Sequence, residues 1–333
     1  MNTNIFRSRI IRFLFATGGN KVRSYSSQFS QNAQRIKPIT VIPLLAFSIP
    51  LFSKDEETPE DKLIETIKRS ILCIQKEEYG KAEQMLHLAL RMAQDQQSQK
   101  GITYIYDVMA NLAMERGQFK KAEKLFVDVM KRLLGEGYPQ DGIKMLHISS
   151  KIAHMAHLEG QLDKALQGFN WTLDQIKEQL KKADTIDEKE LKELLGMTLN
   201  WLGQLLMETQ SFEQAKKCFE ESLQIFYEFY GKANAEAVLI LNNLCVACTS
   251  LDDTTNAKKY LEEALTLAKD FPDMIEAGVL KANLGLLYLH DGMLDKAKEI
   301  CSLAWREGKN KNFKETMEQA SYCLDEIKKA LKK

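Results

Sequence analysis

The hydrophobic positions of this chain follow the period of an α-helix. Apolar residues recur every three to four positions, as at Leu199, Leu202 and Leu206, whereas a half-buried strand would alternate at every second position. Proline breaks helices, and beyond residue 59 it occurs only at Pro139 and Pro272. The pattern therefore predicts an all-α fold.

One alanine returns six times along the chain, at intervals of 40, 43, 50, 42 and 40 residues. These anchor alanines are Ala82, Ala122, Ala165, Ala215, Ala257 and Ala297. Twelve residues before each of them lies a small residue: Ser70, Ala110, Ala153, Gly203, Cys245 and Gly285. Short polar turns, such as the one around Gly117, separate two helical stretches in each interval. Small residues let paired helices approach closely, so the chain is predicted to stack helical hairpins.

The offsets of the small residue, the turn glycine and the anchor alanine resemble the consensus of the tetratricopeptide repeat family. The resemblance covers residues 61–310 and implies a right-handed α-solenoid of about six long hairpins, a scaffold that holds other proteins. The intervals exceed the family's ~34 residues, which indicates longer helices. The charged stretch 177–193 is read either as extended helix or as a loop. Residues 311–333 lose the pattern and are predicted to form a capping helix.

The first part of the chain has the composition of a targeting sequence. Residues 1–54 carry eight basic residues and no acidic one, with hydroxyl and apolar side chains between the arginines. This predicts a mitochondrial transit peptide over residues 1–36, cleaved near Tyr25, rather than a basic nucleic-acid-binding tail. The whole chain has 46 basic and 46 acidic residues, so residues 55–333 keep 38 and 46 and a net charge of −8. An acidic body argues against a nucleic-acid partner.

A short hydrophobic segment follows, over residues 37–54. Its sixteen uncharged residues, 38–53, fall short of the ~20 that a spanning helix needs, and they include Pro43 and Pro50. Three interpretations compete: a short inner-membrane anchor, a sorting signal that is later removed, and a soluble linker. Membrane association is favoured because so apolar a segment is costly to leave in water. Residues 55–60 are predicted to be an acidic linker.

Motifs that carry catalytic or metal chemistry are missing from the sequence. Cys245 and Cys248 form a CxxC pair, but both occupy packing positions of the repeat, and no second pair follows at zinc spacing. The sequence contains no phosphate-binding loop, nucleophile elbow, zinc-protease motif or dinucleotide fingerprint. We therefore expect no catalytic residue, no cofactor, no metal and no small-molecule substrate.

Three histidines, His147, His154 and His157, lie on one side of a predicted helix. The neighbouring Ala153 and Ala156 take the core positions, so the histidines are predicted to project toward the groove. A zinc site is the less favoured interpretation, since one helix seldom supplies three converging ligands. A partner contact or a solvated surface is favoured.

The residues eleven and fifteen positions before each anchor alanine face the groove if the family geometry holds. Together with their neighbours they give the candidate partner-binding residues Tyr104, Asp107, Asn111, His154, His157, Asn200, Gln204, Asn242 and Leu286. Amide side chains suit recognition of a peptide backbone, and the apolar last unit suits a hydrophobic side chain. The alternative is that they are ordinary exposed helix residues.

A more specific likeness lies in residues 102–118, which read ITYIYDVMANLAMERGQ. This run resembles the corresponding repeat of a mitochondrial branch of the tetratricopeptide repeat family. The resemblance implies a non-catalytic inner-membrane factor that binds the core and Rieske iron–sulfur subunits of respiratory complex III, supports assembly and maintenance of the complex, and helps to clear Rieske fragments. The alternative function is a membrane-tethered import receptor or co-chaperone, and a third class, a metal-dependent enzyme, would require bound zinc. Which side of the inner membrane the repeats face stays open.

Overall fold

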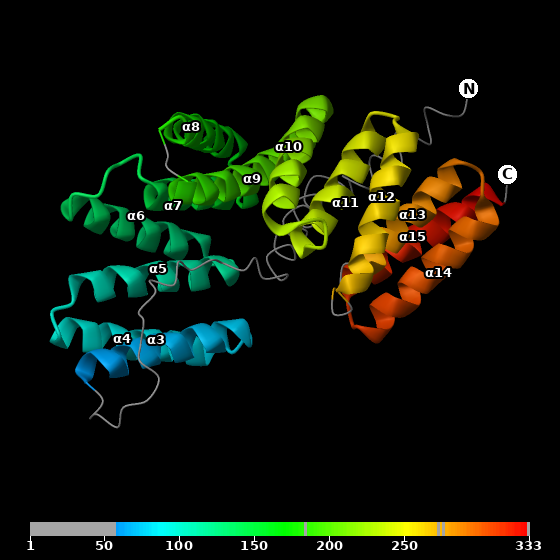
Figure 1. Cartoon of the computed structure of the whole chain (residues 1–333). Coiled ribbons are helices and arrows are strands. Elements are labelled where there is room, and N and C mark those ends of the chain that lie inside the picture. Colours follow the sequence, from blue (N-terminus) through cyan, green and yellow to red (C-terminus); the bar gives the residue numbers. More distant parts are fainter. Residues whose placement is uncertain (1–57, 183–184, 272–273, 275–276, 332–333) are drawn as a thin grey trace. The chain divides into compact units, whose positions relative to one another are not determined.

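The computed structural model describes residues 58–182, 185–271, 274 and 277–331. These residues form two compact units, an N-terminal unit of residues 58–182 and a C-terminal unit of residues 185–331. Throughout the described ranges the regular elements are helices and no strand occurs, which confirms the all-α prediction (Figure 1). The predicted transit peptide, 1–36, and the apolar segment, 37–54, lie outside the described residues.

The N-terminal unit consists of three helical hairpins. They are α3 (Pro59–Gln75) with α4 (Tyr79–Asp95), α5 (Gln99–Glu115) with α6 (Phe119–Gly135), and α7 (Ile143–Leu158) with α8 (Leu162–Leu180). Neighbouring hairpins pack through α4 against α5 and through α6 against α7. The first helices of the second and third hairpins, α5 and α7, carry several of the predicted groove residues.

The C-terminal unit contains three further hairpins and a last helix. They are α9 (Thr185–Glu208) with α10 (Phe212–Tyr230), α11 (Ala235–Ser250) with α12 (Thr254–Leu267) and the short η1 (Ala268–Asp270), α13 (Ala277–His290) with α14 (Leu294–Asn310), and α15 (Lys314–Ala330). Because α15 packs on both α13 and α14, it closes the stack as the predicted capping helix. The described parts thus confirm six hairpins and a cap. None of the helices in these ranges is both long enough and apolar enough to cross a bilayer.

The seams between paired helices contain the recurrent small residues. All six anchor alanines are fully buried, Ala153 is 3% exposed and Gly203 is buried. Four residues after an anchor alanine, the rings of Phe126, Phe169 and Phe219 are fully buried as well. The repeat pattern in the sequence therefore marks the hairpin packing, as predicted.

Turn glycines and capping residues determine where several helices begin and end. Gly117, Gly160 and Gly292 have φ of +67°, +75° and +76° at the turn inside their hairpins, a conformation that costs glycine little. Helix α3 begins at Pro59, inside the segment predicted as the 55–60 linker. The reason is a capping box in which Asp61 N–H donates to the Thr58 hydroxyl and Thr58 N–H to the Asp61 carboxylate, with proline at the first helical position. The stretch 177–193 is helical on both sides of residues 181–184.

Candidate protein-interaction site

In the N-terminal unit, the structure brings together a polar cluster on α5 and α7, formed by Tyr104, Asp107, Asn111 and Lys151. The first three lie on one face of α5, at spacings of three and four residues, and all four side chains are partly exposed. Lys151 of α7 donates from Nζ to Asn111 Oδ1 at 2.7 Å. Asn111 in turn donates from Nδ2 to the Asp107 carbonyl at 2.7 Å. The cluster is thus held in place from two neighbouring hairpins.

Burial and charge set the protonation of this polar cluster. Burial raises the pKa of Tyr104 to about 12, with a smaller contribution from the Asp107 carboxylate, so the phenol stays a neutral donor. Burial lowers the pKa of Lys151, and the carboxylates of Asp107 and Glu115 oppose that shift. The Lys151 ammonium also lies 5.5 Å from the centre of the buried Phe126 ring. The cluster therefore presents fixed donors and acceptors, which suits binding of a polar peptide surface.

His154 and His157 of α7 do not project into a groove, and for these two the expectation is wrong, whereas His147 is partly exposed. His154 is fully buried and His157 is 3% exposed, with ring centres 6.2 Å apart. The prediction assumed that only the side of α7 with Ala153 and Ala156 is buried. Instead α7 is buried over most of its circumference, because both α6 and α8 pack on it and nine of its 16 residues are buried. Contact with a partner through these two imidazoles would require the helix to open.

The environment of α7 keeps His147 and His154 neutral. Burial first, and the neighbouring His157 second, hold the pKa of His154 well below its usual range. Burial and the Lys151 ammonium lower the pKa of His147 to about 3. In the described ranges, no group of three or more histidine, cysteine, aspartate or glutamate side chains could hold a metal ion.

In the C-terminal unit, most of the predicted groove residues are buried. Asn200, Asn242 and Leu286 are 8%, 1% and 3% exposed, and only Gln204 keeps part of its side chain at the surface. The prediction that Asn242 and Leu286 face an open groove is therefore wrong. Leu286 belongs to an apolar cluster with Cys323 and Ile327 of α15, so the capping helix already fills the place predicted for a partner's hydrophobic side chain.

Buried amides link the first helices of successive hairpins in this unit. Asn283 donates to Asn242 at 2.8 Å and Gln319 donates to Asn283 at 3.0 Å, so α11, α13 and α15 are joined in series. Asn243 donates to Asn200 at 3.2 Å, which joins α11 to α9. Hydrogen bonds of this kind satisfy buried polar groups and fix the register of the helices. The role of Asn200 and Asn242 is therefore structural.

Two features were missed by the sequence analysis. Cys301 of α14 and Cys323 of α15 form a disulfide with Cα atoms 6.2 Å apart. The sequence gives no signal for this pairing, because the two cysteines are 22 residues apart and lie on different helices. The second feature is a pocket on α10 and α12, whose lining residues belong to two different repeats. The other conspicuous cysteines, Cys245 and Cys248, are buried as predicted, and burial raises their pKa values to about 12 and 11, which disfavours thiolate chemistry.

Comparison with known proteins agrees with this architecture. A tetratricopeptide repeat family model matches residues 194–270. The chain is similar to BtubC from P. vanneervenii, a solved structure, with a TM-score of 0.55 and 23% identity over 78% of this chain and 94% of that one. At this identity the likeness concerns the fold alone. Fold and repeat pattern together define the class: this is a tetratricopeptide repeat protein.

Two relatives narrow the class further. The chain is 54% identical to the mitochondrial tetratricopeptide repeat protein 19 homolog of Drosophila melanogaster, over 86% of this chain and 78% of the relative. It is 30% identical to the human mitochondrial tetratricopeptide repeat protein 19, over 87% and 83%. The chain belongs to the family of mitochondrial tetratricopeptide repeat protein 19.

Proposed function

We propose that this protein is a non-catalytic adaptor of the mitochondrial inner membrane that binds respiratory complex III. In this proposal it contacts the core and Rieske iron–sulfur subunits, supports assembly and maintenance of the complex, and helps to clear Rieske fragments. One observation carries the proposal: the polar cluster lies in the segment with the most specific family likeness. Tyr104, Asp107 and Asn111 all belong to the run 102–118 on α5.

The polar cluster is suited to binding rather than to catalysis. The side chains of Asn111 and Lys151 are fixed by hydrogen bonds before a partner arrives, so these two lose less conformational freedom on binding. Tyrosine is one of the residue types that often carry much of the binding energy of a protein interface. Helical-repeat proteins present such residues on a surface that extends over several repeats. These properties support an adaptor role in which the protein binds its partner and catalyses no reaction.

The apolar segment 37–54 is proposed to hold the protein at the inner membrane. Its sixteen uncharged residues lie directly before the helical body, which begins at Pro59. Alkaline carbonate extraction of mitochondria tests this: the chain should stay in the membrane pellet. A variant lacking residues 38–53 should instead be released, provided that it is still imported.

The disulfide favours the intermembrane space as the compartment of the repeats. Disulfides persist in oxidising compartments and are rare where glutathione and thioredoxin keep thiols reduced. Cys301 and Cys323 are both fully buried, so tagging with a thiol-reactive reagent under denaturing conditions distinguishes the two states. Without reductant these two cysteines should resist the tag. Cleavage of the repeats by protease in mitoplasts, but not in intact mitochondria, should accompany that result.

Immunocapture from solubilised mitochondria tests the proposed function. The wild-type protein should recover core and Rieske subunits of complex III, and a Tyr104→Ala, Asp107→Ala variant should recover much less of them. A Glu65→Gln, Glu178→Gln variant is the control, because both carboxylates are exposed and lie away from the polar cluster, on α3 and α8. Recovery of translocase or chaperone subunits in place of complex III would instead support the import-receptor alternative.

A further inference from the structure

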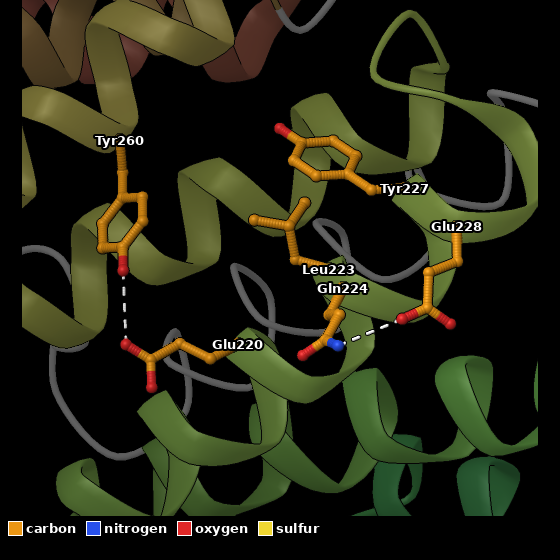
Figure 2. A pocket seen from close by; sticks show the side chains of 6 residues that line it. All are labelled: Glu220, Leu223, Gln224, Tyr227, Glu228 and Tyr260. Carbon is orange, nitrogen blue, oxygen red and sulfur yellow. Dashed lines mark hydrogen bonds between the residues drawn. The ribbon is translucent and has the colours of Figure 1, made fainter.

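The C-terminal unit has a pocket on the second helices of two consecutive hairpins, α10 and α12. It is a cavity of about 430 Å³ lined by Glu220, Leu223, Gln224, Tyr227, Glu228 and Tyr260. The predicted groove residues lie on first helices, so this pocket is a different surface from the polar cluster of the proposed function. Figure 2 shows the six side chains around the opening.

Hydrogen bonds between its residues order the walls of the pocket. Tyr260 donates from its hydroxyl to Glu220 Oε1 at 3.2 Å, and Gln224 donates from Nε2 to Glu228 Oε1 at 3.0 Å (Figure 2). The hydroxyl of Tyr227 donates to Glu263 of α12 at 2.9 Å. Burial and the neighbouring Glu220 raise the pKa of Tyr260 to about 12, so its phenol remains a neutral donor. The two aromatic rings are thereby held in defined positions beside two carboxylates.

The charge of the pocket is negative and only partly compensated. No basic side chain is among the described residues that line it. Lys216 lies 3.9 Å from Glu220 but closer, at 3.6 Å, to Asp253. The Lys232 ammonium lies 5.8 Å from the centre of the Tyr227 ring, so a second cation on that ring would have to displace it, whereas in the described part of the chain no cation lies over the Tyr260 ring. Lys192 interacts electrostatically with Glu228, but its ion pair is with Glu188, at 2.7 Å. A cation entering the pocket would therefore find carboxylates that these lysines do not fully neutralise.

We propose that this pocket binds an arginine side chain from a basic segment of a partner protein. A guanidinium group is planar, so it can stack on a tyrosine ring while its N–H groups donate to a carboxylate. The pocket supplies both features, in the Tyr227 and Tyr260 rings and in the Glu220 and Glu228 carboxylates. Arginine is favoured over lysine because an ammonium group has no plane to stack and pairs with a carboxylate only as a point charge.

Binding of labelled peptides to the full-length protein tests the proposal. The probe is a fluorescein-labelled glycine–serine peptide that carries arginines, and matched peptides carry lysine or the neutral isostere citrulline. Fluorescence anisotropy should show the arginine peptide binding most tightly. A Glu220→Gln, Glu228→Gln variant should weaken that binding by about tenfold, as should Tyr260→Leu, whereas Tyr260→Phe should weaken it less because the ring remains.

The Glu65→Gln, Glu178→Gln control changes the net charge by the same amount and should leave affinity for the arginine peptide unchanged. Equal weakening by the control variant would mean that only overall charge matters, and that result overturns the proposal. So would equal binding of the citrulline peptide, which needs no variant, or the absence of binding by any peptide. Displacement of the peptide by spermine at equal charge concentration would indicate a small polyamine site instead. The peptide measurement does not depend on capture of complex III, so failure of one proposal can be told apart from failure of the other.

Discussion

At Gly203, the close approach of α9 and α10 leaves no room for a side chain. A Cβ atom there would lie 2.5 Å from Cε1 of Phe219, whose ring is fully buried. We expect Gly203→Ala to lower the free energy of unfolding by about 1–2 kcal/mol, because overpacking outweighs the gain in helix propensity. Urea unfolding followed by circular dichroism measures the change. Gly80→Ala is the matched control, since nothing lies within 4 Å of a Cβ at that position, and it should be neutral or slightly stabilising. Equal destabilisation by both variants would contradict the packing described for the seam.

Two histidines of α7, His147 and His154, should make the protein less stable in mild acid. His147 and His154 have pKa values below the ordinary 6.5 in the folded state, to about 3 for His147. Below pH ~6.5 the unfolded chain binds protons that the folded chain does not, so unfolding becomes easier as the pH falls. The expected slope reaches about 1.4 kcal/mol per pH unit for each histidine, until the folded-state pKa is approached.

Urea midpoints at pH 7.5 and pH 5.0 measure this effect. A His147→Gln, His154→Asn variant removes both titrations and should show a smaller difference between the two pH values, whatever its stability at pH 7.5. His87→Gln is the control, because His87 lies on α4 and not on α7. This variant should keep the wild-type difference between the two pH values. If the double variant lost as much stability in acid as the wild type does, the histidines of α7 would not be the cause.

At the scale of elements, the capping helix α15 is fastened to its neighbours in two ways. The disulfide between Cys301 and Cys323 ties it to α14, and the hydrogen bond from Gln319 to Asn283 ties it to α13. Reduction should lower the stability of this end of the unit by about 2–4 kcal/mol, the usual contribution of a disulfide. Hydrogen exchange of the α15 amides with and without reductant measures the loss. A Cys301→Ala, Cys323→Ala variant should be insensitive to reductant, and a persistent effect of reductant on it would point to another cause.

Helices and seams could be predicted because they follow from a periodic pattern. Each anchor alanine lies where two paired helices pack closely, so its six occurrences identify six hairpins. The exposure of single positions could not be obtained in this way. Whether His154 or Leu286 meets water depends on how much of the helix circumference its neighbours cover. In α7 that cover comes from α6 and α8, and at Leu286 it comes from α15, which does not show the repeat pattern.

The disulfide and the acidic pocket depend on contacts between separate repeats. Cys301 and Cys323 are 22 residues apart, and the cysteine spacing alone does not show that α15 folds back onto α14. Glu220 and Tyr260 lie in different hairpins and meet only because α10 and α12 belong to neighbouring ones. Sequence periodicity describes what repeats have in common. Contacts that join different repeats, such as the disulfide and the bond from Tyr260 to Glu220, do not follow from that periodicity.

At the scale of the whole molecule, the protein is a helical-repeat scaffold with two candidate binding surfaces. The N-terminal unit carries the polar cluster, and the C-terminal unit carries the acidic pocket. These two surfaces differ in chemistry: the polar cluster combines both signs of charge with neutral polar groups, and the pocket is negative and aromatic. Variants in one unit should therefore leave the binding measured at the other unchanged, within about 0.5 kcal/mol, as expected for sites that share no residue or partner.

The proposed function is tested by binding of the protein without its predicted transit peptide to purified complex III in detergent. Surface plasmon resonance should show saturable binding by the wild type. The Tyr104→Ala, Asp107→Ala variant should bind about tenfold more weakly or worse, as expected for residues at the centre of an interface, while the Glu65→Gln, Glu178→Gln control binds like the wild type. Absence of wild-type binding, or equal affinity of all three proteins for the complex, would contradict the account.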